Sequence, residues 1–104
     1  MIKVTVLYPN EEGKKFDHAY FSSTHQALVQ KLLTPMGLVV FETEKGVSSA
    51  DPNEPAPFIA VGQLSFNTTD EVHEGFKTHG REIMGDISNY TDIKPTFQIS
   101  ETMS

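Results

Sequence analysis

The sequence contains no cysteine, and this absence excludes several kinds of site. Without thiols the chain can form neither a disulfide framework nor a thiolate zinc or iron–sulfur site, and it has no cysteine nucleophile. Positive charge is also scarce, because eight Lys and Arg residues face fourteen Asp and Glu residues and the net charge is −6. No basic run exceeds Lys14–Lys15. We therefore expect no nucleic-acid partner.

Long apolar runs are missing as well. The longest, at 38–41, is too short to span a bilayer, and Met1–Leu7 is too short and too alternating for a signal peptide. Leu, Ile, Val and Phe still make up 27 of the 104 residues, which exceeds the roughly 20% below which chains tend to stay disordered. The composition predicts one soluble cytoplasmic domain over residues 1–104, without membrane contact, whose core needs no metal or disulfide.

The first half of the chain shows a strand followed by a helix. Apolar side chains alternate along 2–8, as in a β-strand. Asp17 is placed to cap a helix, and Phe16 and Phe21 have the spacing of a hydrophobic staple. Pro35 is expected to end this helix. Its apolar stripe is expected to comprise Phe21, Thr24, His25, Leu28 and Leu32.

The second half repeats the alternation of strand and helix. Strands are expected over 38–43, 58–66 and 96–100, and the proline-rich stretch 46–57 between the first two is expected to be a loop. Thr68 and Glu71 form a capping box at the start of a second helix, and Gly85 is a natural residue to end it. The apolar stripe expected on this helix comprises Val72, Phe76, His79 and Ile83.

The resulting order, β-α-β-β-α-β, predicts an α+β ferredoxin-like fold, in which two helices cover one face of a four-stranded antiparallel sheet. The other face then needs a partner, because the middle strands carry largely apolar side chains on both faces of the sheet. We assign Val39, Phe41, Ile59 and Val61 to that face. A second copy of the chain is the simplest partner, and we expect a homodimer packed through the sheet faces that buries more than ~1,000 Å² in total.

Two motifs in this sequence resemble the EthD family. The first is F-D-x-x-Y-F-x-x-T-H-x-x-L at 16–28, downstream of the strand at 2–9, and the second is D-I-x-x-Y-T-D-x-x-P-x-x-Q at 86–98. The sequence departs from the family pattern at Ala27, where relatives often carry proline. The resemblance implies a dimeric α+β barrel and a small catabolic protein first noticed beside ether-degrading oxygenases. Its wider superfamily includes cofactor-free monooxygenases, lactone isomerases, dehydratases and polyketide cyclases.

His25 is the main candidate for chemistry. It lies on the apolar stripe of the first helix and faces the sheet, where a neutral imidazole in an apolar pocket is suited to accept a proton near neutral pH. Related barrels hold small ligands in a cleft between helices and sheet. The alternative is a buried histidine that only satisfies a backbone or hydroxyl group. The expected pocket around it comprises Phe21, Leu28, Phe76, His79 and Ile83.

Other polar residues are weaker candidates. Tyr8 and Tyr90 stand at element ends and either could act as an acid beside His25, and we select Tyr90 as the second catalytic residue. Tyr20 is ~140° from His25 on an ideal helix and is not expected to share its pocket. Asp86 is expected to cap the turn after the second helix, and a catalytic carboxylate is the lesser alternative.

Metal and cofactor binding are not expected. His18 and His25 are two helical turns apart, about 10 Å by helical rise, and are too far apart to share a metal. His73 and His79 point to different sides of their helix. No inward-facing histidine and carboxylate recur at a spacing of three or four residues. We therefore predict no bound metal and no redox cofactor.

Three functions remain open at this point. The first is a cofactor-free lyase or isomerase that binds a small hydrophobic metabolite and uses His25 as acid and base. The second is a non-enzymatic accessory or carrier dimer that supports an oxygenase pathway, and the third is a structural or regulatory dimer without a ligand. Polar groups converging on His25 would favour the enzyme, whereas an entirely apolar lining would favour the carrier.

Overall fold

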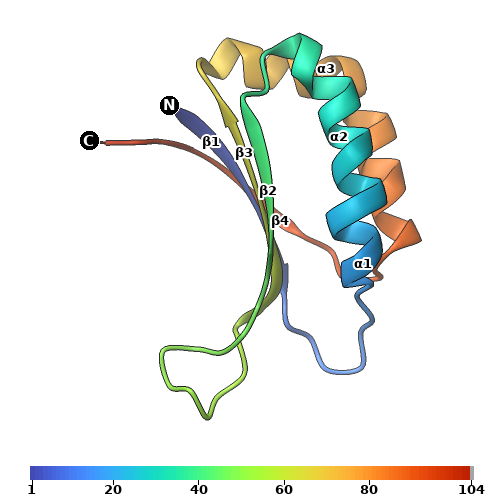
Figure 1. The fold of residues 1–104 in the computed structure, drawn as a ribbon, viewed down its shortest axis with the longest axis vertical. Coiled ribbons are helices and arrows are strands. Elements are labelled where there is room, and N and C mark those ends of the chain that lie inside the picture. The colour runs from blue at the N-terminus through green and yellow to red at the C-terminus, as the bar shows by residue number, and fades with distance from the viewer. Residues whose placement is uncertain (104) are drawn as a thin grey trace.

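A computed structural model describes residues 1–103 as one layer of helices on a four-stranded sheet (Figure 1). The strands are β1 (Ile2–Pro9), β2 (Val40–Lys45), β3 (Phe58–Phe66) and β4 (Thr96–Glu101). The helices are α1 (His18–Tyr20), α2 (Gln26–Leu33) and α3 (Thr69–Asp86), and a π-turn (Phe21–His25) joins the first two into one continuous helix. The sheet order is β2-β3-β1-β4, with all pairs antiparallel, which confirms the predicted ferredoxin-like fold.

The helix starts follow the capping rules read from the sequence. The Asp17 carboxylate accepts a hydrogen bond from the Tyr20 backbone N–H at 3.1 Å, and the rings of Phe16 and Phe21 lie 5.1 Å apart. The capping box of Thr68 and Glu71 is complete. These contacts satisfy backbone groups that a helix start leaves unpaired, which explains why both helices begin where the sequence predicts.

The helix ends differ from the prediction. The sequence suggested Gly85 as the end of the second helix, but α3 continues through Asp86, and Gly85 does not adopt a positive φ. The glycine that does end a helical segment is Gly37, with φ +109°, after the short 3-10 turn that follows α2. That conformation is open to glycine and strained for other residues.

The π-turn changes which residues of the first helix face the sheet. The buried positions are Phe21, His25, Val29 and Leu33, which recur every four residues. The predicted stripe placed Leu28 among them, but Leu28 is only half-buried. A π-turn bonds residue i to i+5, so it shifts the side-chain phase that a regular helix would have.

The two faces of the sheet are clearly distinct. Alternate residues of β1, from Ile2 to Tyr8, are buried under the helices, together with Ala60, Leu64 and Phe66 of β3. Phe41 belongs to this helix-covered face and is 4% exposed, so its predicted place on the free face is wrong. The register pairs Phe41 with buried Leu64, which fixes its side. On the free face, Val61 lies between its strand neighbours Leu7 and Glu44.

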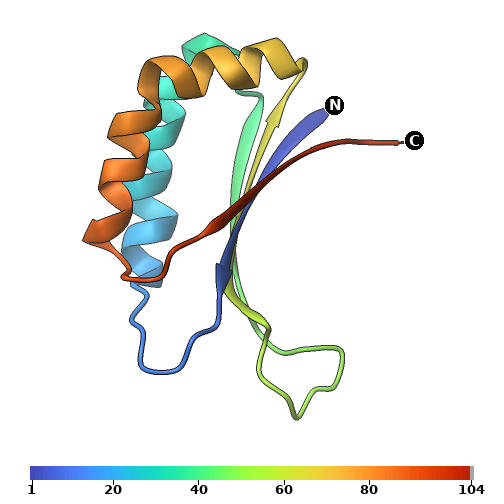
Figure 2. The ribbon, with the colours of Figure 1, turned by 180° about the vertical axis from the view of Figure 1, so that it is seen from behind.

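The last strand is only partly covered. Phe97 and Ile99 of β4 pair with Val6 and Val4 and so point to the helix side, yet they are 38% and 44% exposed. Figure 2 shows the C-terminal end of this strand diverging from the helical layer. The loop between β2 and β3 projects beyond the sheet (Figure 1). No helix within residues 1–103 is long and apolar enough to cross a membrane.

Candidate functional site

His25 lies at the end of the π-turn and is 4% exposed. Its imidazole stacks on Phe21 with a centroid distance of 5.9 Å, and the Tyr90 ring lies 4.7 Å away. Phe41 approaches from the sheet with a centroid distance of 6.4 Å. The ring is therefore held on three sides by aromatic groups. π-turns of this kind occur frequently at functional sites.

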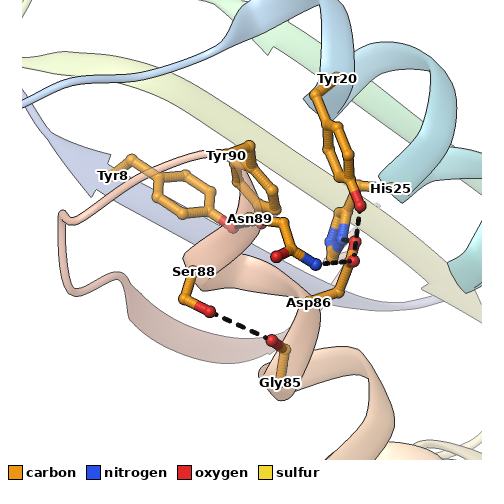
Figure 3. Close-up of polar contacts among 8 residues, drawn as sticks. All are labelled: Tyr8, Tyr20, His25, Gly85, Asp86, Ser88, Asn89 and Tyr90. Atoms are coloured by element: carbon orange, nitrogen blue, oxygen red, sulfur yellow. Dashed lines mark hydrogen bonds and ion pairs between the residues drawn. The ribbon is translucent and has the colours of Figure 1, made fainter.

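The polar partner of His25 is Asp86, at the end of α3 (Figure 3). His25 Nδ1 lies 2.8 Å from Asp86 Oδ2, and the other carboxylate oxygen accepts hydrogen bonds from Tyr20 Oη at 2.8 Å and Asn89 Nδ2 at 2.9 Å. The predicted capping role of Asp86 is wrong, because its side chain makes no cap bond to the following turn. Tyr20 was not expected to share the pocket of His25, and it does not line that pocket, but its hydroxyl reaches the carboxylate that binds His25.

The Asp86 carboxylate fixes the protonation of the imidazole. An ionised carboxylate only accepts hydrogen bonds, so Nδ1 carries the hydrogen and Nε2 of the neutral ring keeps its lone pair. Burial lowers the pKa of His25, although the hydrogen bond and the charge of Asp86 act in the opposite direction. Burial alone would raise the pKa of Asp86, but the hydrogen bonds from Asn89, His25 and Tyr20 outweigh it and the pKa is lowered. At neutral pH the pair is therefore a neutral imidazole beside a carboxylate.

The second imidazole nitrogen of His25, Nε2, is unpaired, since it has no hydrogen-bond partner within residues 1–103. No unpaired side-chain N or O atom in this part of the chain is completely buried, so Nε2 keeps some accessible surface. His25 is also one of the residues that line the adjacent pocket. A nitrogen lone pair in that position can accept a proton or a hydrogen bond from a ligand.

The pocket beside His25 is small and apolar. Its free volume is about 20 Å³, roughly the space of one water molecule, so a larger ligand requires the side chains to move. Among the residues predicted to surround His25, Phe21, Phe76 and Ile83 line the pocket, whereas Leu28 and His79 do not. The complete lining is Val6, Tyr8, Phe21, His25, Val29, Phe41, Gly62, Leu64, Phe76, Ile83, Ile87 and Phe97.

Tyr90, which the sequence suggested as a second catalytic residue, lies beside His25 but does not line the pocket. Its hydroxyl is 2.5 Å from the hydroxyl of Tyr8, which does line it. Burial raises the pKa of Tyr8 to about 12, against the effect of the hydrogen bond from Tyr90. Burial, together with the nearby Tyr8, also raises the pKa of Tyr90. Both phenols therefore stay protonated at neutral pH.

The segments that carry the two sequence motifs contact each other directly. The Asp17 backbone N–H donates to the Tyr90 carbonyl at 2.8 Å, and Phe16 forms a β-bridge with Thr91. The Thr91 hydroxyl donates to the Lys15 carbonyl at 2.6 Å. These bonds fix the segment after α3 against the start of the first helix. They explain how Tyr90 comes to lie beside His25.

Sequence reasoning missed Asp86 and Tyr20 as members of the site. One signal was available for Asp86, because a carboxylate in the last turn of a helix opposes the helix dipole and is unfavourable without another partner. As for a metal, no three His, Asp or Glu side chains in the described part of the chain lie together as a metal site would need.

Comparisons with known proteins agree with the fold. The family model described as the EthD domain matches residues 11–94. An EthD-like protein from Ralstonia eutropha is 39% identical, with 96% of this chain and 89% of that chain covered and a TM-score of 0.90. The comparison with curated proteins gives no match.

More distant structures share the fold alone. An ethyl tert-butyl ether degradation (EthD) family protein from Bacillus halodurans is 19% identical, with 99% of both chains covered and a TM-score of 0.64. A DABB-family protein with a ferredoxin-like fold from Mesorhizobium loti is 12% identical, with 99% of this chain and 97% of that chain covered and a TM-score of 0.60. The family model and the Ralstonia relative together show that the chain belongs to the EthD family.

Proposed function

We propose that this EthD-family chain binds an apolar small molecule and catalyses a cofactor-free proton transfer on it, as a lyase or an isomerase. The observation that carries the proposal is the pair of His25 and Asp86, joined at 2.8 Å through Nδ1 while Nε2 stays unpaired within the described chain, in an imidazole that lines the pocket. The same arrangement orients and activates histidine bases in other enzymes. A catabolic role is consistent with the ether-degradation name of the Bacillus relative.

The reaction begins when Nε2 removes a proton from a carbon atom of the ligand, and the electron pair of that C–H bond stays on the ligand. The imidazolium that forms is stabilised by the Asp86 carboxylate. In an isomerisation His25 returns the proton to a different atom of the ligand. In an elimination the electron pair expels a leaving group, which then takes the proton from His25.

The pocket supports this role through its low polarity. Apolar and aromatic side chains surround the imidazole, and their burial of the ring keeps it neutral and ready to accept a proton at neutral pH. Water is largely excluded from so small a space. Electrostatic interactions with the ligand are consequently stronger than they would be in solvent.

A carrier without catalysis is the second candidate, and the lining supports it, because His25 and Tyr8 are the only lining side chains with polar atoms. We propose a homodimer in either case. Leu7, Ile59 and Val61 are half-buried on the sheet face that no helix covers, and a second copy packed there would bury them.

The proposal is tested by hydrogen exchange on two probes with weakly acidic C–H bonds, acetophenone and indene. Each is incubated with the protein in D₂O near neutral pH, and deuterium uptake is followed by NMR. We expect exchange above the buffer rate with the wild type, loss of that exchange in His25→Gln, and unchanged exchange in His73→Gln, which alters an exposed histidine of α3. Equal exchange in the wild type and His25→Gln would contradict the proposal, and binding without exchange in either would identify a carrier.

A further inference from the structure

The paired hydroxyls of Tyr8 and Tyr90 hold one hydrogen atom more than their mutual bond can use. The two oxygens lie 2.5 Å apart, and the side chains are 1% and 2% exposed. Each hydroxyl carries one hydrogen, and the bond between them uses only one of the two. Within residues 1–103, neither hydroxyl has another hydrogen-bond partner. The second hydrogen must therefore find an acceptor outside the protein chain.

The surroundings of the two rings indicate which hydroxyl carries the free hydrogen. The Tyr90 ring lies 4.7 Å from the His25 ring and 5.9 Å from the Tyr20 ring, with both on the side away from Tyr8 (Figure 3), and Tyr90 does not line the pocket. Tyr8 does line it. Tyr90 is therefore the donor to Tyr8, and the hydrogen of Tyr8 is the one available to the pocket.

We propose that Tyr8, supported by Tyr90, donates a hydrogen bond to an oxygen atom of the ligand, and that the ligand is an apolar carbonyl compound. This inference rests on the proposed function of the same pocket. Tyr8 and His25 both line that pocket, and the Phe21 ring packs against both, 5.4 Å from Tyr8 and 5.9 Å from His25. A carbonyl group can therefore present its oxygen to Tyr8 and an adjacent C–H to His25.

The two groups then act on the two ends of one reacting unit. His25 removes the proton from the carbon beside the carbonyl, and the electron pair of that bond forms a C=C bond while the carbonyl electrons move onto oxygen. The hydrogen bond from Tyr8 stabilises the negative charge on that oxygen. The bond that Tyr8 accepts from Tyr90 polarises its hydroxyl and strengthens this donation. Tyr8 keeps its proton throughout.

A test without ligand compares urea unfolding of Tyr8→Phe, Tyr90→Phe and the double variant. If one hydroxyl hydrogen has no acceptor within the protein, the wild type carries an unfavourable buried donor that the double variant removes. We then expect the double variant to have a higher urea midpoint than the wild type, whereas each single variant, which strands the remaining hydroxyl, has a lower one. A double variant less stable than the wild type would overturn the proposal, because the pair would then be a satisfied structural contact.

A test with ligand uses acetophenone and α-methylstyrene, which have the same shape but carry C=O and C=CH₂ respectively. Dissociation constants are measured by NMR chemical-shift titration, and their ratio isolates recognition of the oxygen. We expect this ratio to shift about tenfold against the ketone in Tyr8→Phe, the factor given by one hydrogen bond, and by less in Tyr90→Phe. An unchanged ratio in Tyr8→Phe would overturn the proposal.

The same titration separates this inference from the proposed function. Recognition of the oxygen does not require proton transfer, so His25→Gln should keep the wild-type preference for the ketone although it loses deuterium exchange. If the wild type shows the preference but no exchange, the catalytic proposal fails and the role of Tyr8 stands. If the wild type shows exchange but no preference for the ketone, the proposed role of Tyr8 fails and the catalytic proposal stands.

Discussion

Asp86→Asn is the substitution that tests the site most directly, because it changes one charge and almost no volume. In the wild type, Oδ1 of Asp86 accepts from Tyr20 and Asn89, while Oδ2 faces Nδ1 of His25. The single amide oxygen of Asn is best placed where two donors meet. Its NH₂ group then faces His25 Nδ1. An NH₂ group only donates, so we expect the imidazole hydrogen to move to Nε2.

The size of the effect follows from the bonds lost. The side chains of His25 and Asp86 are 5% and 11% exposed, so their charge-assisted hydrogen bond is shielded from solvent. Bonds to charged groups contribute about 1.5–3 kcal/mol, and the Asn amide recovers part of that. We expect the free energy of unfolding to fall by about 1–2 kcal/mol. With Nε2 protonated, the base is lost, and proton-transfer activity should fall about 10²–10⁴-fold.

Long-range ¹H–¹⁵N NMR spectra of the imidazole distinguish the two tautomers directly, and urea melts give the stability. Asp92→Asn is the matched control, because Asp92 is an exposed carboxylate that accepts one backbone hydrogen bond from Lys15 and does not contact His25. If Asp86→Asn keeps its hydrogen on Nδ1 and retains wild-type exchange on acetophenone, the assigned role of Asp86 is wrong.

Three further changes probe other parts of the molecule. Burial lowers the pKa of His25 below 6.5, so the unfolded chain binds a proton before the folded protein does as the pH falls. Urea melts should therefore show the free energy of unfolding declining below about pH 6.5, with a smaller decline in His25→Gln. Val61→Glu should convert a sedimenting dimer into monomers or aggregates, and a wild-type particle of 11.6 kDa at micromolar concentration would rule the dimer out. Gly37→Ala should lower stability by about 1–3 kcal/mol, because φ is +109° and the new methyl carbon would lie 2.5 Å from Glu71, whereas Gly85→Ala, with open space around it, should be neutral or slightly stabilising.

Local signals in the sequence were sufficient for the element starts. Asp17, Thr68 and Glu71 act through bonds to neighbours within four residues, so their roles can be read without knowing the fold. Phe41 shows where this reasoning stops. Alternation places it opposite Val40, but alternation cannot say which of two apolar sets the helices cover.

The site itself depended on features that the sequence does not reveal. Tyr20 and His25 are five residues apart, and a regular helix would separate them by about 140°. The π-turn brings residues at this spacing to one side, as an α-helix does for residues four apart, and Tyr20 therefore reaches the carboxylate that binds His25. Asp86 was misassigned because two of its three partners, His25 and Tyr20, come from another helix, whereas caps were sought only in its own neighbourhood.

The site is also closed by contacts between residues that are far apart along the chain. His25 and Asp86 are 61 residues apart, and Tyr8 and Tyr90 are 82 apart. Pairings across such long loops carry a large closure entropy and generally form late in folding. During synthesis, β1 and the first helix leave the ribosome well before the segment that contains Tyr90. The imidazole tautomer set by Asp86 therefore serves as a reporter of completed folding, and truncation ahead of residue 86 would leave a chain that has His25 but no means to orient it.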